Sequence, residues 1–169
     1  MHKLMFVLLF TLFLTGNIVG QTVDTLVIPH KIEYAKIPVR DKVRKECQLE
    51  EKIARFMVDY TKKNGTYSNI VREKPDSGDY HVLEAKITAA AGSGGGAWSG
   101  AKSVRIEGTL KDASGKLIGN FSAGRFSGGG AFGAYKGTCS ILGRCTKAIG
   151  KDVAQWLKSP TQDALLGDH

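Results

Sequence analysis

Residues 137–159 constrain the fold more than any other part of the chain, because their apolar side chains recur at helical spacing. These side chains would line one side of a helix of about four to five turns. They are Leu142, Cys145, Ile149, Val153, Trp156 and Leu157. Thr138 or Ser140 can cap the start of this helix, and Pro160 stops it. A helix with one apolar side needs an apolar surface to pack on, so the rest of the chain must supply one.

A second helix and a series of strands supply that surface. The second helix is predicted over residues 46–63, where apolar residues again recur at helical spacing, and Asn64-Gly65 is a typical helix stop. Strands are predicted over residues 22–28, 67–71, 80–90, 103–110 and 117–126. Alternation of apolar and polar residues is typical of an antiparallel sheet covered on one side. The sequence therefore predicts an α+β fold: an antiparallel sheet of about four to five strands with two helices packed on one face.

The first twenty residues have the pattern of a secretory signal peptide. Lys3 precedes an apolar run of about eleven residues, well short of the roughly 20 that a membrane-spanning helix needs. Small or polar residues follow, and we expect cleavage between Gly20 and Gln21, or after Gly16. The cleavage point lacks the cysteine of a bacterial lipoprotein. The prediction is a protein exported to the periplasm or secreted.

The rest of the chain is predicted to form one main domain. Residues 21–45 are expected to be an N-terminal strand and a basic connecting segment, residues 46–158 the α+β domain, and residues 159–169 a flexible tail. The formal net charge is +8. A basic exported protein either uses this charge for solubility or meets anionic partners. The predicted partner is an envelope protein or an anionic envelope polymer. The scattered basic residues argue against nucleic acid.

Three cysteines indicate a disulfide in an exported protein. Cys139 and Cys145 in one regular helix would be separated by about 9 Å, beyond the usual Cα–Cα limit of about 7 Å. Either Cys139 precedes the helix, or Cys47 pairs with one of the other two. We favour Cys47 with Cys139, and Cys145 is the alternative partner. The third cysteine is then a free thiol or forms a bond between two chains.

Two glycine-rich segments, 91–100 and 127–137, share a Gly-Gly-Gly-Ala sequence followed by an aromatic residue. The strand order predicts that both emerge at the same end of the sheet. They contain the candidate interaction residues Trp98, Ser99, Phe132 and Tyr135.

Motifs for phosphate and dinucleotide binding are matched only superficially. Residues 96–103 have Ala101 where a phosphate-binding loop needs glycine, and a strand follows where that loop needs a helix. Residues 128–133 match the dinucleotide fingerprint but lack a surrounding parallel βαβ unit. No cofactor-binding residue is predicted.

Catalytic and metal-binding patterns are not recognised either. Ser99 is displaced from the position of a nucleophilic serine in its glycine motif, and the histidines have no second ligand at metal spacing. The prediction is a non-enzyme without catalytic or metal-binding residues. The alternative is an enzyme that depends on a serine or on Cys145, the latter with His30 or His81 as its base.

Three motifs indicate a family: Glu46-Cys-Gln-Leu-Glu50, Gly137-Thr-Cys-Ser-Ile-Leu-Gly-Arg-Cys145 and Lys151-Asp-Val-Ala-Gln-Trp-Leu157. The chain resembles a family of small exported Gram-negative bacterial proteins of unknown function, which is distantly similar to a lipoprotein domain of unknown function. The resemblance covers roughly residues 46–158. It implies an α+β domain in the periplasm or cell envelope with no assigned enzymatic activity.

The leading functional hypothesis is therefore a non-enzymatic accessory or binding protein of the periplasm or cell envelope. An alternative is a membrane-active or oligomeric component of envelope export. That alternative comes from a loose resemblance to the soluble part of curli-export channel lipoproteins, in which segments between strands become membrane hairpins. Neither glycine-rich segment has the ten-residue alternating apolar run that a membrane strand needs. Contact with a membrane surface, without a spanning segment, stays open.

Overall fold

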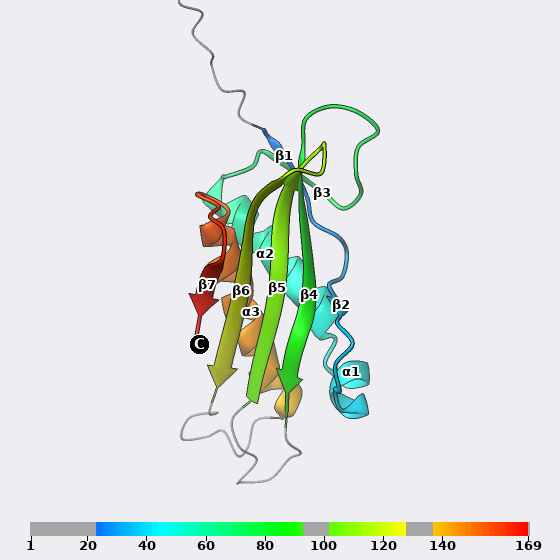
Figure 1. Cartoon of the computed structure of the whole chain (residues 1–169). Coiled ribbons are helices and arrows are strands. Elements are labelled where there is room, and N and C mark those ends of the chain that lie inside the picture. The colour runs from blue at the N-terminus through cyan, green and yellow to red at the C-terminus, as the bar shows by residue number, and fades with distance from the viewer. Residues whose placement is uncertain (1–22, 93–101, 128–136, 169) are drawn as a thin grey trace, which may run out of the picture.

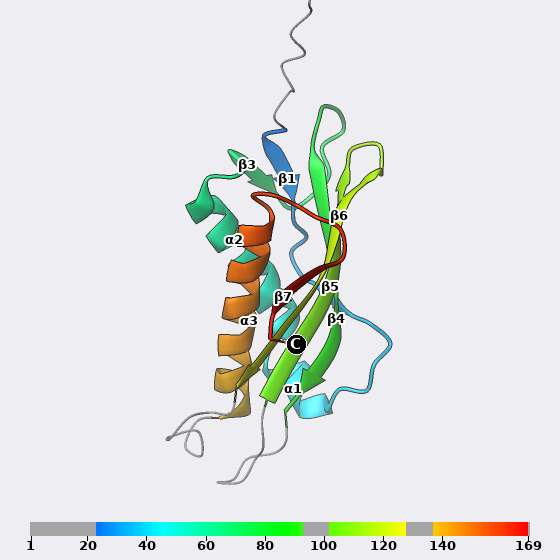
Figure 2. The ribbon, with the colours of Figure 1, turned by 60° about the vertical axis from the view of Figure 1, so that its left-hand side comes forward.

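The computed structural model of the chain describes residues 23–92, 102–127 and 137–168. The predicted signal peptide and its cleavage site at Gly20 and Gln21 lie outside these residues. The described residues form a seven-stranded sheet and three helices. Two of the helices pack side by side on one face of the sheet, as Figures 1 and 2 show from two sides. The predicted α+β class is confirmed.

The centre of the sheet is an antiparallel meander of three long strands. The strands are β1 (Thr25–Val27), β2 (Glu33–Tyr34), β3 (Asn69–Val71), β4 (His81–Ala91), β5 (Lys102–Asp112), β6 (Leu117–Ser127) and β7 (Ala164–Gly167). Their order is β3-β1-β4-β5-β6-β7, and β2 pairs with β4 beside β1. Alternation in the long strands points Leu83, Ile106 and Phe121 toward the helices, where they are buried.

The sheet is mixed, so the prediction of an antiparallel sheet of four to five strands was wrong in detail. β1 is parallel to β3, and β6 is parallel to β7. Parallel neighbours need a long crossover connection, and a helix supplies it in both cases. β1 and β2 are also parallel to β4. The two-residue β2 and four-residue β7 are too short to show alternation in the sequence.

The helices are α1 (Asp41–Glu46), α2 (Leu49–Asn64) and α3 (Thr138–Trp156). Both predicted helices are present, but α1 is a third helix within the predicted connecting segment. Gln48 has a left-handed φ of 50°, which separates α1 from α2 and moves the start of the second helix to Leu49. The N-cap residue of α3 is Gly137, which has no side chain that could accept a capping hydrogen bond. The predicted cap by Thr138 or Ser140 was therefore wrong.

The core lies between the sheet and the pair α2–α3. The apolar side of α3 is buried as its spacing predicts, and α2 contributes Ile53 and Met57. The two helices approach closely at Gly150, where an added Cβ would lie 2.6 Å from the Cβ of Phe56. Near the end of α3, the rings of Phe121 and Trp156 meet edge to face at 4.8 Å between centroids.

The C-terminal residues differ from the predicted flexible tail, because residues 164–167 form β7 at the edge of the sheet. The N–H of Asp168 donates to the Gly124 carbonyl at 2.8 Å, and Arg125 Nη1 donates to Asp168 Oδ1 at 3.0 Å. Arg125 also binds both carboxylate oxygens of Asp152 on α3, at 2.7 and 2.8 Å. A charge-assisted cluster therefore fixes the end of the chain to α3 and β6. Residues 23–45 likewise belong to the same sheet and core.

Candidate functional site

A groove of about 930 Å³ lies on the sheet face that α2 and α3 leave open. Its volume falls within the usual range of ligand sites, about 300–1,000 Å³. Residues 29–35 form one wall and residues 163–165 form the other. The floor consists of the outward-pointing residues Glu84, Lys86, Thr88, Glu107, Thr109, Asn120 and Ser122. The alternation that buries one face of β4, β5 and β6 thus supplies a polar floor on the other.

Thr88 occupies a special position in the floor. The pairing of β4 with β5 shifts register between Ile87 and Ala89, which makes Thr88 the extra residue of a β-bulge. Its hydroxyl is buried and has no hydrogen-bond partner among the residues that the structure describes. Leaving such a hydroxyl unpaired costs roughly 1–3 kcal/mol. A residue of the groove lining therefore carries an unsatisfied buried polar atom at the bulge.

Charges of both signs alternate across the floor. Lys111 Nζ donates to Glu84 Oε2 at 2.7 Å, and this hydrogen bond holds the pKa of Glu84 below its usual value. The strand register places Lys86 between Glu33 of β2 and Glu107 of β5. Because cations and anions are interleaved, the floor offers both donors and acceptors. Such a surface suits a polar ligand without a large net charge.

Hydrogen bonds hold both walls in place. Asn120 Nδ2 donates to Asp163 Oδ1 at 2.9 Å, and the backbone N–H of Asp163 donates to Asn120 Oδ1 at 3.0 Å. The opposite wall is tied to the sheet by the Ala35 N–H, which donates to the Ile87 carbonyl at 2.9 Å. The groove is thus held open by bonds within the protein.

Both glycine-rich segments begin and end at one end of the sheet, which we call the Ala91 end. There β4 finishes at Ala91, paired with Ser103, and Lys102 pairs with Ser127. The prediction that the two segments share an end of the sheet is confirmed by these flanking residues. The candidate interaction residues themselves lie outside the described residues; they are Trp98, Ser99, Phe132 and Tyr135.

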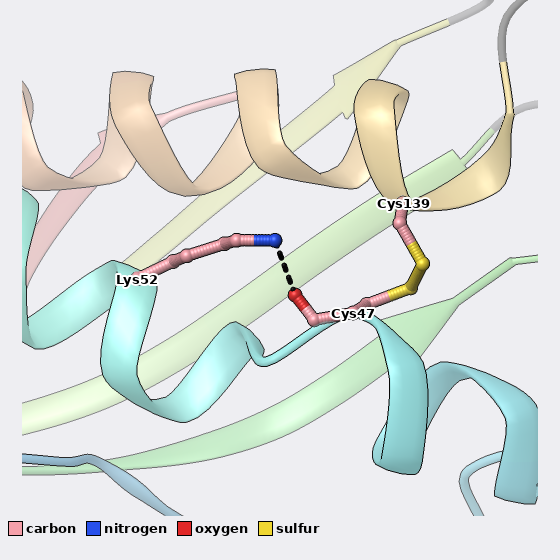
Figure 3. Close-up of a disulfide and its surroundings, with 3 residues drawn as sticks. All are labelled: Cys47, Lys52 and Cys139. Carbon is pink, nitrogen blue, oxygen red and sulfur yellow. Dashed lines mark hydrogen bonds between the residues drawn. A yellow bond between two sulfur atoms is a disulfide. The ribbon is translucent and has the colours of Figure 1, made fainter.

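A disulfide lies close to the Ala91 end. Cys47 and Cys139 are joined, with their Cα atoms 4.8 Å apart, which confirms the favoured pairing over the alternative with Cys145. The bond connects the first turn of α3 to the junction of α1 and α2, as Figure 3 shows. Lys52 Nζ donates to the Cys47 carbonyl at 2.7 Å and so satisfies an oxygen at the end of α1.

The free thiol of Cys145 is not placed for catalysis with a histidine. It is buried, its Sγ lies 3.9 Å from the Lys102 carbonyl, and burial raises its pKa. A nucleophilic cysteine needs the opposite shift in pKa. His81 begins β4 opposite Asp112, about 33 Å along β5 from Lys102 at roughly 3.3 Å per residue. His30 lies in the groove wall, across the sheet from α3. The structure therefore does not bring Cys145 together with either histidine.

His81 instead pairs with a tyrosine at the opposite end of the sheet, which we call the His81 end. There β4 begins at His81, β5 finishes at Asp112 and β6 begins at Leu117. The Tyr67 hydroxyl lies 2.7 Å from His81 Nδ1. Burial raises the pKa of Tyr67 to about 12 and lowers the pKa of His81. Tyr67 therefore keeps its proton at neutral pH beside a neutral imidazole, and the tautomer of His81 decides which of the two groups donates.

Within residues 23–92, 102–127 and 137–168, no group of three or more histidine, cysteine or acidic side chains is placed to hold a metal ion. No helix there is both long and apolar enough to cross a bilayer.

The groove is the feature that sequence reasoning missed. Alternation in β4 and β5 marked the face of Glu84 and Glu107 as polar, which is the ordinary pattern of a solvated surface. The two walls come from residues 29–35 and 163–165, which flank the floor only after β2 and β7 join the sheet. The available signal was the number of hydroxyl and amide side chains in the alternating positions.

No protein-family model matches the chain, and no curated protein matches its sequence. Among solved structures, a single-substitution variant of the PelC dodecamer from Paraburkholderia phytofirmans has 13% identity and a TM-score of 0.45, covering 77% of this chain and 86% of that chain. A second PelC dodecamer structure from that organism has 12% identity and a TM-score of 0.44, covering 77% and 88%. Protein XCC0632 from Xanthomonas campestris, described under the family model DUF330, has 11% identity and a TM-score of 0.49, covering 78% and 81%.

This chain is similar to these structures in the overall course of its backbone, at identities of 11 to 13%. The family resemblance identified from the sequence motifs stays a prediction, together with its lipoprotein part and its cysteine and glycine motifs.

Proposed function

We propose that the chain is an exported, non-enzymatic binding protein of the cell envelope that holds a polar ligand in the open-face groove. The observation that carries this proposal is Thr88, a residue of the groove lining whose buried hydroxyl has no hydrogen-bond partner among the described residues. A ligand atom that bonds to this hydroxyl would recover the free energy that the empty groove forfeits.

The floor supports a ligand with donors and acceptors of its own. Thr109, Ser122 and Asn120 can both donate and accept hydrogen bonds, and Lys86 and Glu107 add one charge of each sign. Because hydrogen bonds hold both walls, binding requires little ordering of the protein. These features favour an extended polar molecule, such as an oligosaccharide or a short peptide segment.

The proposal of a non-enzyme rests on the nature of the groove and of the cysteine. The groove chemistry is that of hydrogen-bonding recognition, and the raised pKa of Cys145 opposes a nucleophilic role. Export and an envelope location rest on the signal-peptide pattern of residues 1–20.

Thermal unfolding with a panel of soluble probes tests the groove. The panel contains neutral oligosaccharides, short polar peptides and polyamines, and the variant is Thr88→Val, which replaces the hydroxyl with a methyl group of similar volume. A probe at about 100 times its Kd should stabilise the wild type by about 2.7 kcal/mol, which corresponds to roughly 5–10 °C in Tm. Thr88→Val should bind that probe about fivefold more weakly, because one hydrogen bond contributes about 1 kcal/mol.

Thr66→Val is the matched control, because the Thr66 hydroxyl is also buried and unpartnered but does not line the groove. Both variants should keep or slightly raise the Tm without a probe, since each removes an unsatisfied hydroxyl. A probe that stabilises the wild type and Thr88→Val equally would refute the groove as its site. A panel without any stabilising member would contradict a polar ligand of these classes.

A further inference from the structure

A cluster of cations covers one side of the Ala91 end. Residues 36–46 contain five basic and two acidic residues. The basic side chains are all exposed, and none forms a salt bridge with the residues that the structure describes. They are Lys36, Arg40, Lys42, Arg44 and Lys45. Figure 1 shows α1, which carries three of them, beside the last residues of β4. The disulfide at Cys47 fixes this helix to the start of α3.

The His81 end has no comparable excess of charge. Residues 72–79 and 111–116, which lie there, together contain four basic and four acidic residues. The two ends are about 33 Å apart along the long strands, while charges in physiological salt are screened over about 8 Å. The positive potential of the Ala91 end is therefore a local property of that end.

An exposed aromatic side chain accompanies the cations. Phe126 is 59% exposed and pairs with Ser103 near the last residues of β6, at the Ala91 end. Cations draw a protein to any polyanion, whereas an exposed aromatic ring adds affinity at the apolar boundary of a lipid headgroup layer. α1 and the last residues of β6, which include Phe126, lie at the same end of the sheet.

We propose that the Ala91 end docks on an anionic phospholipid membrane, with the α1 cations on lipid phosphates and Phe126 at the headgroup–acyl boundary. This inference is independent of the proposed ligand binding. The groove lies on the open face of the sheet, and its lining includes neither α1 nor Phe126. A protein docked in this way keeps the groove open to solvent while holding it near the membrane.

Co-sedimentation of the full chain with vesicles tests the docking. One set of vesicles contains equal parts of phosphatidylglycerol and phosphatidylcholine, and the other contains phosphatidylcholine alone. We expect stronger binding to the anionic set than to phosphatidylcholine alone, and this difference should shrink with added salt. Each basic residue near a membrane surface contributes roughly fivefold in affinity, so Lys42→Glu with Lys45→Glu should weaken binding at least about 30-fold.

The control pair is Lys74→Glu with Lys158→Glu, two exposed lysines away from the Ala91 end that give the same change in net charge. This pair should bind as the wild type does. All variants keep residues 1–22, so any contribution of that segment is common to them. If both double variants lose the same vesicle affinity, net charge rather than the local surface determines binding, and the proposal is refuted. Failure of the wild type to bind anionic vesicles would also refute the proposal.

Phe126→Ser separates a membrane from a soluble polyanion. It should weaken vesicle binding several-fold, because a ring that inserts at the boundary loses its apolar contact, and leave binding to soluble polyphosphate unchanged. Unchanged vesicle binding by Phe126→Ser, with efficient displacement by polyphosphate, would assign the cations to a polyanion and overturn the membrane proposal. Unchanged vesicle binding by the groove variant Thr88→Val would show that the two proposals succeed or fail separately.

Discussion

The two ends of the sheet are held together by different means. At the His81 end, a tight hairpin joins β5 to β6, and Asp112 Oδ1 accepts hydrogen bonds from the N–H groups of Ser114 and Lys116 at 2.9 and 3.0 Å. At the Ala91 end, the connections from β4 to β5 and from β6 to α3 pass through the glycine-rich sequences 93–101 and 128–136. Glycine loses more conformational entropy on folding than any other residue. A covalent bond between Cys47 and Cys139 stands close to this end.

The difference shows how connection length selects the means of stabilisation. A hairpin of a few residues is fixed by bonds between neighbours in the sequence. Where a connection is long and glycine-rich, a link between distant residues can hold together the elements that it joins. The disulfide provides that link, because it joins residues separated by 92 positions and restricts the unfolded chain.

The largest expected effect is the loss of that bond in the double variant Cys47→Ala, Cys139→Ala. A cross-link across 92 residues contributes about 4.6 kcal/mol to the free energy of unfolding in the chain-entropy model. The Tm should therefore fall by roughly 10 °C. Urea denaturation measures the loss, and hydrogen exchange should show the fastest new opening at the Ala91 end. If hydrogen exchange instead increases first at the His81 end, the disulfide does not act mainly on the Ala91 end.

The next largest effect compares two positions along α3. It tests whether α2 and α3 pack more closely far from the disulfide than near it. A Cβ added at Gly150 would lie 2.6 Å from the Cβ of Phe56 and 3.0 Å from the backbone nitrogen of Met57, so Gly150→Ala should cost about 1–3 kcal/mol. Gly143→Ala is the matched control in the same helix, nearer the disulfide. Nothing lies within 4 Å of its added Cβ, so this variant should gain about 0.5–1 kcal/mol. Equal destabilisation by both, measured in urea, would refute a difference between the two halves of the helix pair.

Much of the fold follows from patterns that are local in the sequence. The apolar stripe through Leu142 and Ile149 repeats over five turns, and the long strands alternate over about ten residues each, so these elements were predicted correctly. The helix α1 buries only Val43, which gives no period to detect. In β7, Leu165 and Leu166 are adjacent rather than alternating, and pairing with β6 alone makes them a strand.

The candidate site was less accessible to sequence reasoning than the fold. The disulfide between Cys47 and Cys139 was favoured because both residues were expected at helix N-termini, and Cys145 was left open as the alternative partner. The groove depends on two terminal segments that flank the same three strands, which is a property of the tertiary structure. The Thr88 bulge is similarly invisible, because one extra residue changes the register with β5 without changing the composition of β4.

The smallest expected effect concerns pH and should appear at the His81 end alone. Burial lowers the pKa of His81 in the folded protein below its unfolded value of 6.5. The unfolded chain therefore binds a proton first as pH falls, so the stability that the neutral imidazole provides is complete above pH 6.5 and is lost below it. The pKa values of Glu84 and Asp112 are lowered too, but their contributions to stability are lost only below their usual pKa values of 4.5 and 3.8. The window from about pH 7 to pH 5 thus isolates the histidine.

In that window, the Tm of the wild type should fall more than that of His81→Asn, whose side-chain oxygen can still accept the Tyr67 hydrogen bond without titrating. Amide exchange, corrected for its intrinsic pH dependence, should accelerate where β4 begins and β5 finishes. It should stay unchanged around Cys47 and Cys139, because a disulfide does not titrate. If the two proteins show parallel pH slopes, the histidine is not the acid-sensitive element. If the exchange accelerates equally at both ends, the ends do not differ in their response to acid, and the contrast between covalent and titratable stabilisation fails.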